Sequence, residues 1–239
     1  MPNFYNIEKD NDLVFVWTGT STGMSLNNLD FILSSHSGLI ICDATSAAFI
    51  YDLDWNKLDA TVFSWQKALG SESQHGIVVL SPKAVERLRE NKKKNIPKIL
   101  DLTNYSLPIN TPSTLSILDF NLALDWFKKK GGINWGNSVC KENKEVIDNW
   151  IKNNKYLKFF CDKKKFQALT PSYLTFKRPI NSKSYEKVLF FLENEKIAYD
   201  IKSYRLAPNG IRIWTGPTIL KKDLIILTNW LDWSFDNIK

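Results

Sequence analysis

Cysteine and long apolar runs are scarce in this sequence of 239 residues. Its three cysteines, Cys42, Cys140 and Cys161, are widely spaced and match no zinc-binding pattern. No apolar run approaches the length of a membrane span, and residues 1–5 have neither the basic start nor the apolar stretch of a signal peptide. We therefore expect a cytoplasmic protein in a reducing compartment, without a membrane segment.

Arginine is also rare, and lysine supplies most of the 32 basic residues. Together with 25 acidic residues they give a net charge of +7. Lysine triplets at residues 92–94, 128–130 and 163–165 are the candidates for nucleic-acid contacts. They lack the interleaved aromatic residues that would stack on bases, so we interpret them as solvated surface and expect no nucleic-acid partner. A mildly positive field suits small anionic substrates instead.

The composition is that of a globular chain, with 44% hydrophobic and 13% aromatic residues. A chain of this length can bury one large core or two small ones. The glycine pair at residues 131–132 marks our expected boundary. Residues 1–130 would belong to a larger domain with a linking helix, and residues 131–239 would form a small α+β domain.

Two short apolar runs end in polar residues of complementary chemistry. Residues 39–42 read as a buried strand that ends at Asp43, and residues 60–63 read as a second strand that leads into Ser64-Trp65-Gln66-Lys67. If these strands are parallel, their carboxyl ends lie on one edge of a sheet, where open α/β sheets bind ligands. A carboxylate and an amine would then face the same crevice.

That pair suits pyridoxal phosphate, which requires a lysine amine for covalent attachment and a carboxylate that keeps its ring nitrogen protonated. Asp43 and Lys67 would supply these groups. On spacing alone, the alternative is that both are solvated loop residues, as charged residues at strand ends usually are.

The amino-acid sequences of the two segments also resemble those of a known family. Asp43-Ala44-Thr45-Ser46-Ala47 and Ser64-Trp65-Gln66-Lys67-Ala68-Leu69-Gly70, followed by His75-Gly76, resemble phosphoserine aminotransferases, and the likeness runs from about Pro2 to Phe235. It implies the α/β fold type I of pyridoxal phosphate-dependent transferases, with a partial, mostly parallel central sheet and a small α+β C-terminal domain. The family is longer at its N-terminus, so the chain is expected to match its C-terminal part.

The resemblance also implies roles for individual residues. Lys67 would hold the cofactor and act as the general base, Asp43 would bind the ring nitrogen, and Gln66 would flank the ring. Thr20, in the turn after the first strand, would contact the ring oxygen or the phosphate; otherwise it is an ordinary turn residue. The remaining cofactor contacts would come from a second subunit of a homodimer, through Asn110 and Thr111.

Thr111 and His75 each have a structural alternative. Thr111 precedes Pro112, so it could simply cap a helix that runs to Lys130. That helix is expected to turn one apolar face inward, formed by Leu115, Leu118, Leu122, Trp126 and Phe127. His75 is either a packed or capping histidine, which we favour, or a residue close to the cofactor.

The second half of the chain is expected to alternate helices and strands, including a helix from about residue 137 and strands at residues 199–203 and 211–214. Arg212 lies between Ile211 and Ile213 and is either an exposed arginine or a bidentate clamp for a substrate carboxylate. By resemblance it is the clamp. Arg205 or Tyr204 falls near a position where other branches of the family carry a histidine that reads the substrate phosphate.

The resemblance implies transfer of an amino group from glutamate to 3-phosphohydroxypyruvate, giving phosphoserine and 2-oxoglutarate in serine biosynthesis. Another aminotransferase of the same class, such as an alanine–glyoxylate aminotransferase, is an alternative. A cysteine desulfurase would need a mobile catalytic cysteine and a stacked histidine, and neither pattern is present. A truncated, non-catalytic remnant is the second alternative. Because the family's main phosphate donors lie upstream, the chain alone is expected to be weak or inactive as a catalyst in either case.

Overall fold

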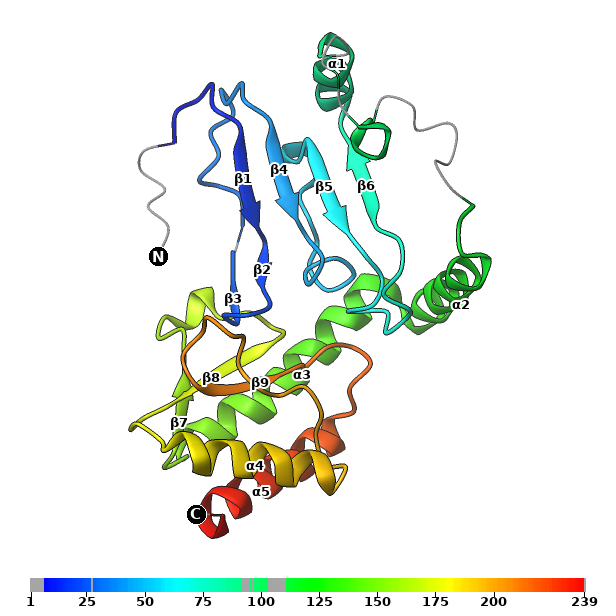
Figure 1. Ribbon diagram of the computed structural model, residues 1–239. Helices are drawn as coiled ribbons and strands as arrows, with labels where there is room; N and C mark the ends of the chain where they lie inside the picture. Colours follow the sequence, from blue (N-terminus) through cyan, green and yellow to red (C-terminus); the bar gives the residue numbers. More distant parts are fainter. Residues whose placement is uncertain (1–6, 27, 92–94, 96, 103–110, 239) are drawn as a thin grey trace. The chain divides into compact units, whose positions relative to one another are not determined.

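The computed structural model describes residues 7–26, 28–91, 95, 97–102 and 111–238. The chain divides into two compact units. The first comprises the chain up to Trp17 together with Asn28–Lys130, and the second comprises Thr18–Asn27 together with Gly131–Lys239. Figure 1 shows both units with their elements labelled.

The helices and strands of both units are short to moderate in length. In chain order they are β1 (Leu13–Val16), β2 (Thr18–Gly19), β3 (Met24–Ser25), β4 (Ile40–Asp43), a 3-10 turn (Trp55–Lys57), β5 (Ala60–Phe63), β6 (Ile77–Leu80), α1 (Pro82–Glu90), a 3-10 turn (Lys98–Leu100), α2 (Thr114–Lys130), α3 (Gly132–Lys152), β7 (Leu157–Phe159), a 3-10 turn (Lys164–Phe166), β8 (Ser172–Phe176), α4 (Ser182–Asn194), β9 (Gly210–Ile213) and α5 (Lys221–Asn237).

The first unit is built on a four-stranded sheet in the order β1-β4-β5-β6 (Figure 1). Strands β1, β4 and β5 are parallel, whereas β6 runs antiparallel to β5. The parallel strands are rich in β-branched residues, which pack well on a pleated surface. Register pairs Asp43 with Val16 on one side and with Val62 on the other, so the carboxyl ends of these strands are aligned as predicted.

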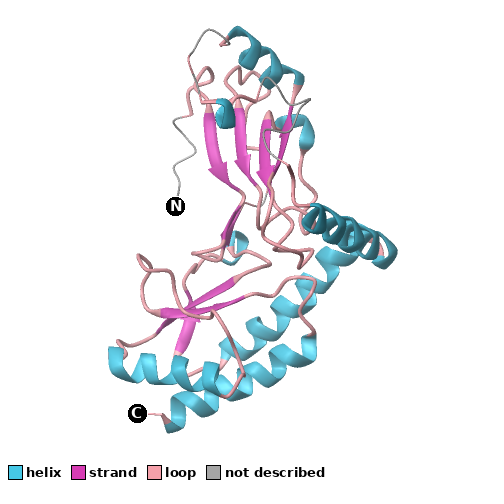
Figure 2. Ribbon diagram, turned by 45° about the vertical axis from the view of Figure 1, so that its right-hand side comes forward, coloured by secondary structure: helices cyan, strands magenta, loops and turns pink. Residues whose placement is uncertain are grey.

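The second unit packs helices α3, α4 and α5 with the antiparallel sheet β7-β8-β9 (Figure 2). Its core draws on every one of these helices and on all three strands, through residues such as Ile147, Leu157, Leu174, Val188, Ile211 and Leu224. The unit is therefore an α+β arrangement with its own hydrophobic core.

The hairpin β2–β3 belongs to the second unit although it lies early in the sequence. Met24 forms a bridge with Gln167, and the carbonyl oxygen of Gly23 accepts a hydrogen bond from the Ala168 amide at 2.9 Å. Gly23 has a φ of +62°, and a Cβ there would lie 2.7 Å from the Tyr173 amide nitrogen. A glycine is therefore required where the hairpin meets this unit.

Helix α2 differs from its prediction in its start and in its buried face. It begins at Thr114, and the hydroxyl of Ser113, not of Thr111, accepts the Ser116 amide hydrogen bond at 3.4 Å. The cap predicted at Thr111 is therefore wrong by two residues, because Ser113 offers an equally good hydroxyl closer to the helix.

The face predicted to turn inward on α2 is mostly exposed. Leu115 is 80% exposed, and Leu118, Leu122 and Trp126 are also exposed. Only Phe127 is buried, and its ring packs against that of Phe49 at 5.7 Å. The apolar spacing therefore predicted the wrong face, because the buried and half-buried residues of α2 are Ser116, Asp119, Phe120, Ala123, Leu124 and Phe127.

Two elements of the second unit also differ from prediction. Helix α3 begins at Gly132, about one turn before the expected start. The strand expected at residues 199–203 is reduced to a single bridge between Lys202 and Ile211. The cause is local, since Asp200 has a φ of 52°, a left-handed conformation that interrupts an extended backbone.

Candidate functional site

Asp43 occupies the last position of β4, where hydrogen bonds fix its backbone and one carboxylate oxygen. Its carbonyl oxygen accepts from the Trp17 amide at 3.0 Å, and its Oδ1 accepts from the Thr45 amide at 2.9 Å. Its Oδ2 makes no hydrogen bond to the part of the chain that is described. The half-buried side chain is therefore oriented, with one oxygen left to accept a further donor.

Lys67 lies in a tight turn directly after β5. The Gly70 amide donates to the Lys67 carbonyl at 3.2 Å, and the Ser71 amide donates to the Trp65 carbonyl at 3.4 Å. Gly70 closes the turn with a φ of 64°, a conformation that glycine adopts without strain. Within the turn the Ser64 hydroxyl donates to Oε1 of Gln66. Lys67 is thus a half-buried lysine at the strand end next to that of Asp43.

Helix α2 holds this turn through contacts that the sequence did not reveal. The Asp119 carboxylate accepts from the Ser71 hydroxyl and from the Glu72 amide, the latter at 3.0 Å. These two hydrogen bonds keep the pKa of Asp119 below its ordinary value of 3.8. Phe120 stacks on Trp65 with ring centroids 4.5 Å apart. Asp119 had no recognisable signal, because its partners are 47 and 48 residues away.

His75 has a structural role, in line with the interpretation favoured above. Its Nε2 accepts the Ser113 amide hydrogen bond at 3.1 Å, immediately before α2. Its ring centroid lies 6.0 Å from that of Trp65, and its backbone is left-handed with a φ of 63°. His75 therefore connects Trp65 to the residue that precedes α2.

The other predicted site residues lie elsewhere. Thr20 is half-buried in the turn between β2 and β3, so it belongs to the second unit. Arg212 and Arg205 are also in that unit, Arg212 on β9 and Arg205 in an exposed turn. Thr111 is exposed and precedes α2, and Asn110 lies outside the described residues. Among the described residues, Asp43, Gln66 and Lys67 are the predicted site residues that lie at or just beyond the carboxyl ends of the neighbouring strands β4 and β5.

Arg212 is not the exposed arginine that one reading of the sequence allowed. Its side chain is only 11% exposed, and its Nη2 donates to Oδ2 of Asp200 at 2.8 Å. The Tyr204 ring lies 4.6 Å from its guanidinium carbon. Arg212 is therefore a fixed, largely buried cation, whereas Arg205 makes no ion pair with any described residue.

The cysteines are unsuited to catalysis. Cys42, Cys140 and Cys161 are all reduced and buried. Burial raises the pKa of Cys42 and of Cys140 to about 12, so both thiols are protonated and poorly nucleophilic at neutral pH. This geometry disfavours the desulfurase chemistry that needs a mobile thiolate. Among the described residues there is also no cluster of three or more metal-ligating side chains.

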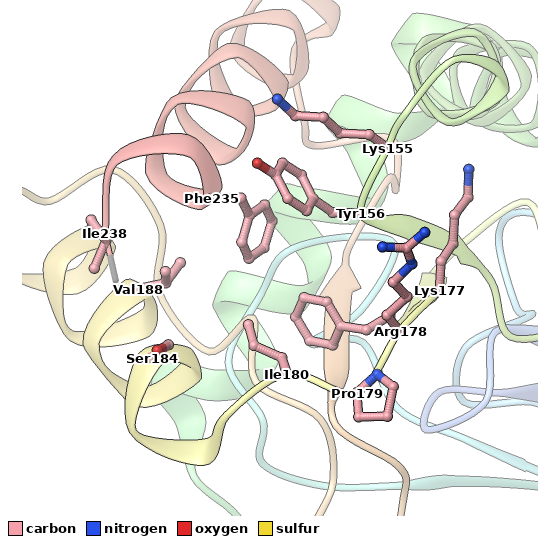
Figure 3. Close-up of a pocket in the computed structure, with 11 residues that line it drawn as sticks. Lys155, Tyr156, Lys177, Arg178, Pro179, Ile180, Ser184, Val188, Phe235 and Ile238 are labelled. Atoms are coloured by element: carbon pink, nitrogen blue, oxygen red, sulfur yellow. The ribbon is translucent and has the colours of Figure 1, made fainter.

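The second unit contains a cavity of about 700 Å³ (Figure 3). Tyr156 and Phe235 lie next to each other in its lining, with ring centroids 5.4 Å apart and ring planes tilted by 46°, and Lys177 and Arg178 also line it. Lys155, which also lines it, is paired with Asp236 at 2.7 Å. No predicted site residue lines this cavity.

None of the helices in the described part of the chain is long and apolar enough to cross a membrane.

Comparison with known proteins gives the chain a family. No family model matches it. The phosphoserine aminotransferases of Methanosarcina mazei and Methanosarcina barkeri are 40% and 37% identical to it over 249 aligned residues, which cover 100% of this chain and 67% of each relative. The chain thus spans about two thirds of the length of these curated relatives.

Solved structures agree in fold at lower sequence identity. A phosphoserine aminotransferase from Cytophaga hutchinsonii superimposes with a TM-score of 0.78 at 20% identity, covering 98% of this chain and 65% of that one. An alanine–glyoxylate aminotransferase from Nostoc gives a TM-score of 0.81 at 18% identity, covering 95% and 62%. These matches confirm the predicted fold type I. The 40% identity places the chain in the phosphoserine aminotransferase family, whose cofactor, bound in the solved enzyme from Trichomonas vaginalis, is pyridoxal phosphate.

Proposed function

We propose that this protein transfers the amino group of glutamate to 3-phosphohydroxypyruvate, producing phosphoserine and 2-oxoglutarate in serine biosynthesis. The names of the two Methanosarcina relatives support this choice of reaction over others of the same fold. The observation that carries it is that Asp43 and the turn holding Lys67 follow the aligned carboxyl ends of two neighbouring parallel strands.

The donor and acceptor set at these strand ends fits pyridoxal phosphate. Oδ1 of Asp43 is engaged by the Thr45 amide, which leaves Oδ2 to accept the N–H of a protonated ring nitrogen. Lys67 follows the neighbouring strand and is presented by a turn whose two backbone hydrogen bonds hold it in place. Asp43 and Lys67 would hold the cofactor at its ring nitrogen and its aldehyde carbon.

When bound, the cofactor supplies an electron sink for the charge left at the substrate α-carbon. The Lys67 amine would remove the α-proton of the substrate as a general base and return it as a general acid. Asp43 keeps the ring nitrogen protonated by its negative charge. Gln66 flanks the ring, and its side chain is oriented by the Ser64 hydroxyl.

The remaining roles are proposed for residues outside that cluster. Thr20 would bind the ring oxygen or the phosphate, and Asn110 with Thr111 would complete the phosphate site of the second subunit in a homodimer. Arg212 would clamp the substrate α-carboxylate, for which its fixed, largely buried guanidinium is suited. Arg205 would contact the substrate phosphate. The proposed setting is the cytoplasm.

A coupled assay with glutamate and 3-phosphohydroxypyruvate tests this function. We expect 2-oxoglutarate to form in proportion to the phosphohydroxypyruvate consumed. An alanine–glyoxylate aminotransferase, a protein of the same fold, is the alternative. Glyoxylate used in preference to phosphohydroxypyruvate, with alanine as the better donor, would establish that alternative.

A further inference from the structure

Arg212 is held by a carboxylate from its own unit. Its Nη2 donates to Oδ2 of Asp200 at 2.8 Å and to the Asp200 carbonyl at 3.1 Å. The Arg212 amide donates to the Ile201 carbonyl at 2.8 Å, which fixes the backbone beside Asp200. A buried cation and an exposed anion thus meet in one ion pair, with the Arg212 side chain 11% exposed and the Asp200 side chain 88% exposed.

The ion pair leaves the guanidinium incompletely satisfied. Nε of Arg212 is buried and has no hydrogen-bond partner. Nε and Nη2 share one edge of the planar guanidinium, and a carboxylate that binds this edge with both oxygens engages both nitrogens. Asp200 engages Nη2 alone. A free carboxylate arriving at the same edge would gain the Nε bond that Asp200 does not make.

Two features allow another carboxylate to replace Asp200 at the Nε–Nη2 edge of Arg212. The Tyr204 ring lies 4.6 Å from the guanidinium carbon, a cation–π contact that fixes the plane of the group whether or not Asp200 is bound. The Asp200 side chain, being exposed, is solvated again at little cost when it leaves.

We propose that Asp200 is an internal stand-in for the substrate carboxylate. It neutralises and orients Arg212 when no substrate is bound, and a substrate carboxylate displaces it by binding Nε and Nη2 together. Asp200 is then a positioning residue that sets how tightly carboxylate substrates bind. This inference rests on the clamp role proposed for Arg212.

The test substitution is Asp200→Asn. Asparagine tolerates the left-handed backbone at this position, where φ is 52°, and the carbonyl bond to Nη2 does not depend on the side chain. The matched control is Glu186→Gln, which removes the same charge from an exposed ion pair with Lys202 in the same unit. Arg212→Lys tests the clamp itself.

The measurement is calorimetric binding of 2-oxoglutarate to the full chain loaded with pyridoxal phosphate, a pairing that binds without turnover. We expect the dissociation constant to fall about two- to five-fold in Asp200→Asn, the range that an exposed ion pair supports, and to stay unchanged in Glu186→Gln. A merely structural residue would not tighten binding when it is replaced.

Each outcome separates the two claims. Unchanged or weaker binding in Asp200→Asn, with binding lost in Arg212→Lys, overturns the stand-in role and leaves the clamp intact. Tighter binding in Glu186→Gln to the same degree overturns it as well, because the effect would then be general electrostatics. Unchanged binding in Arg212→Lys refutes the clamp, and the stand-in role falls with it.

Discussion

Replacing Asp43 by asparagine should separate folding from catalysis. The amide oxygen of asparagine can still accept the Thr45 hydrogen bond that Oδ1 of Asp43 accepts at 2.9 Å. Only the charge on that acceptor is lost. A charged acceptor contributes about 1 kcal/mol more than a neutral one, so the free energy of unfolding of Asp43→Asn should fall by about that amount.

Turnover should respond far more strongly. The atom that replaces Oδ2 is an N–H₂ group, which cannot accept a hydrogen bond from a protonated ring nitrogen. Loss of one pre-organised electrostatic partner in an active site lowers turnover by roughly 10²- to 10³-fold, and we expect at least that loss here. Urea denaturation measures the stability, and the coupled assay measures the turnover. Equal turnover in Asp43→Asn and its parent would refute the assigned role.

Asp59 offers the matched control, because it is a carboxylate at the opposite ends of the same strands. It accepts the Ile40 amide at 2.9 Å and the Ser81 hydroxyl at 2.7 Å, and it is paired with Lys83 at 3.3 Å. Asp59→Asn should cost about 1–3 kcal/mol of stability and leave the turnover of folded protein unchanged. A loss of turnover in both variants alike would mean that the assay reports folding.

Three further predictions concern stability, reactivity and pH. Ile147→Ala, in the core of the second unit, should lower the free energy of unfolding by about 2–4 kcal/mol in urea denaturation; a change below about 0.5 kcal/mol would contradict the packing. Cys42 and Cys140, with pKa values of about 12, should react with a thiol reagent at pH 8 only after unfolding; rapid labelling of native protein would contradict their burial. Hydrogen bonds lower the pKa of Asp119, so its hydrogen bond with Ser71 should stabilise the fold above the ordinary Asp pKa and be lost as pH falls through the lowered value. Ser71→Ala should therefore reduce the acid sensitivity of the free energy of unfolding, measured by denaturation at a series of pH values. Identical pH profiles for the variant and its parent would contradict this.

Local sequence signals were sufficient to place Asp43 at the end of one strand and Lys67 just after another. The runs that became β4 and β5 are apolar and β-branched, and each stops at a polar residue, so the positions of Asp43 and Lys67 followed from pattern alone. The parallel pairing of β4 and β5 that aligns them depends on the tertiary structure. It was expected only from the resemblance to the family.

Contacts between distant segments could not be read in the same way. Asp119 looks like any charged residue on a helix surface, and only the fold places its carboxylate on Ser71 and the Glu72 amide. The strand expected around Asp200 does not form, because Asp200 has a left-handed backbone that interrupts the extended stretch. Aspartate can adopt this conformation, but its presence in a sequence does not predict it. The start of α2 was ambiguous because Thr111 and Ser113 are both good caps.

The central claim is that Lys67 is the residue to which the cofactor is attached. Borohydride reduction of the protein with pyridoxal phosphate, followed by peptide mapping, tests it most directly. We predict that the label is found on the peptide containing Ser64-Trp65-Gln66-Lys67, at Lys67, and that Lys67→Arg abolishes it. Specific, stoichiometric labelling of any other lysine would contradict the account.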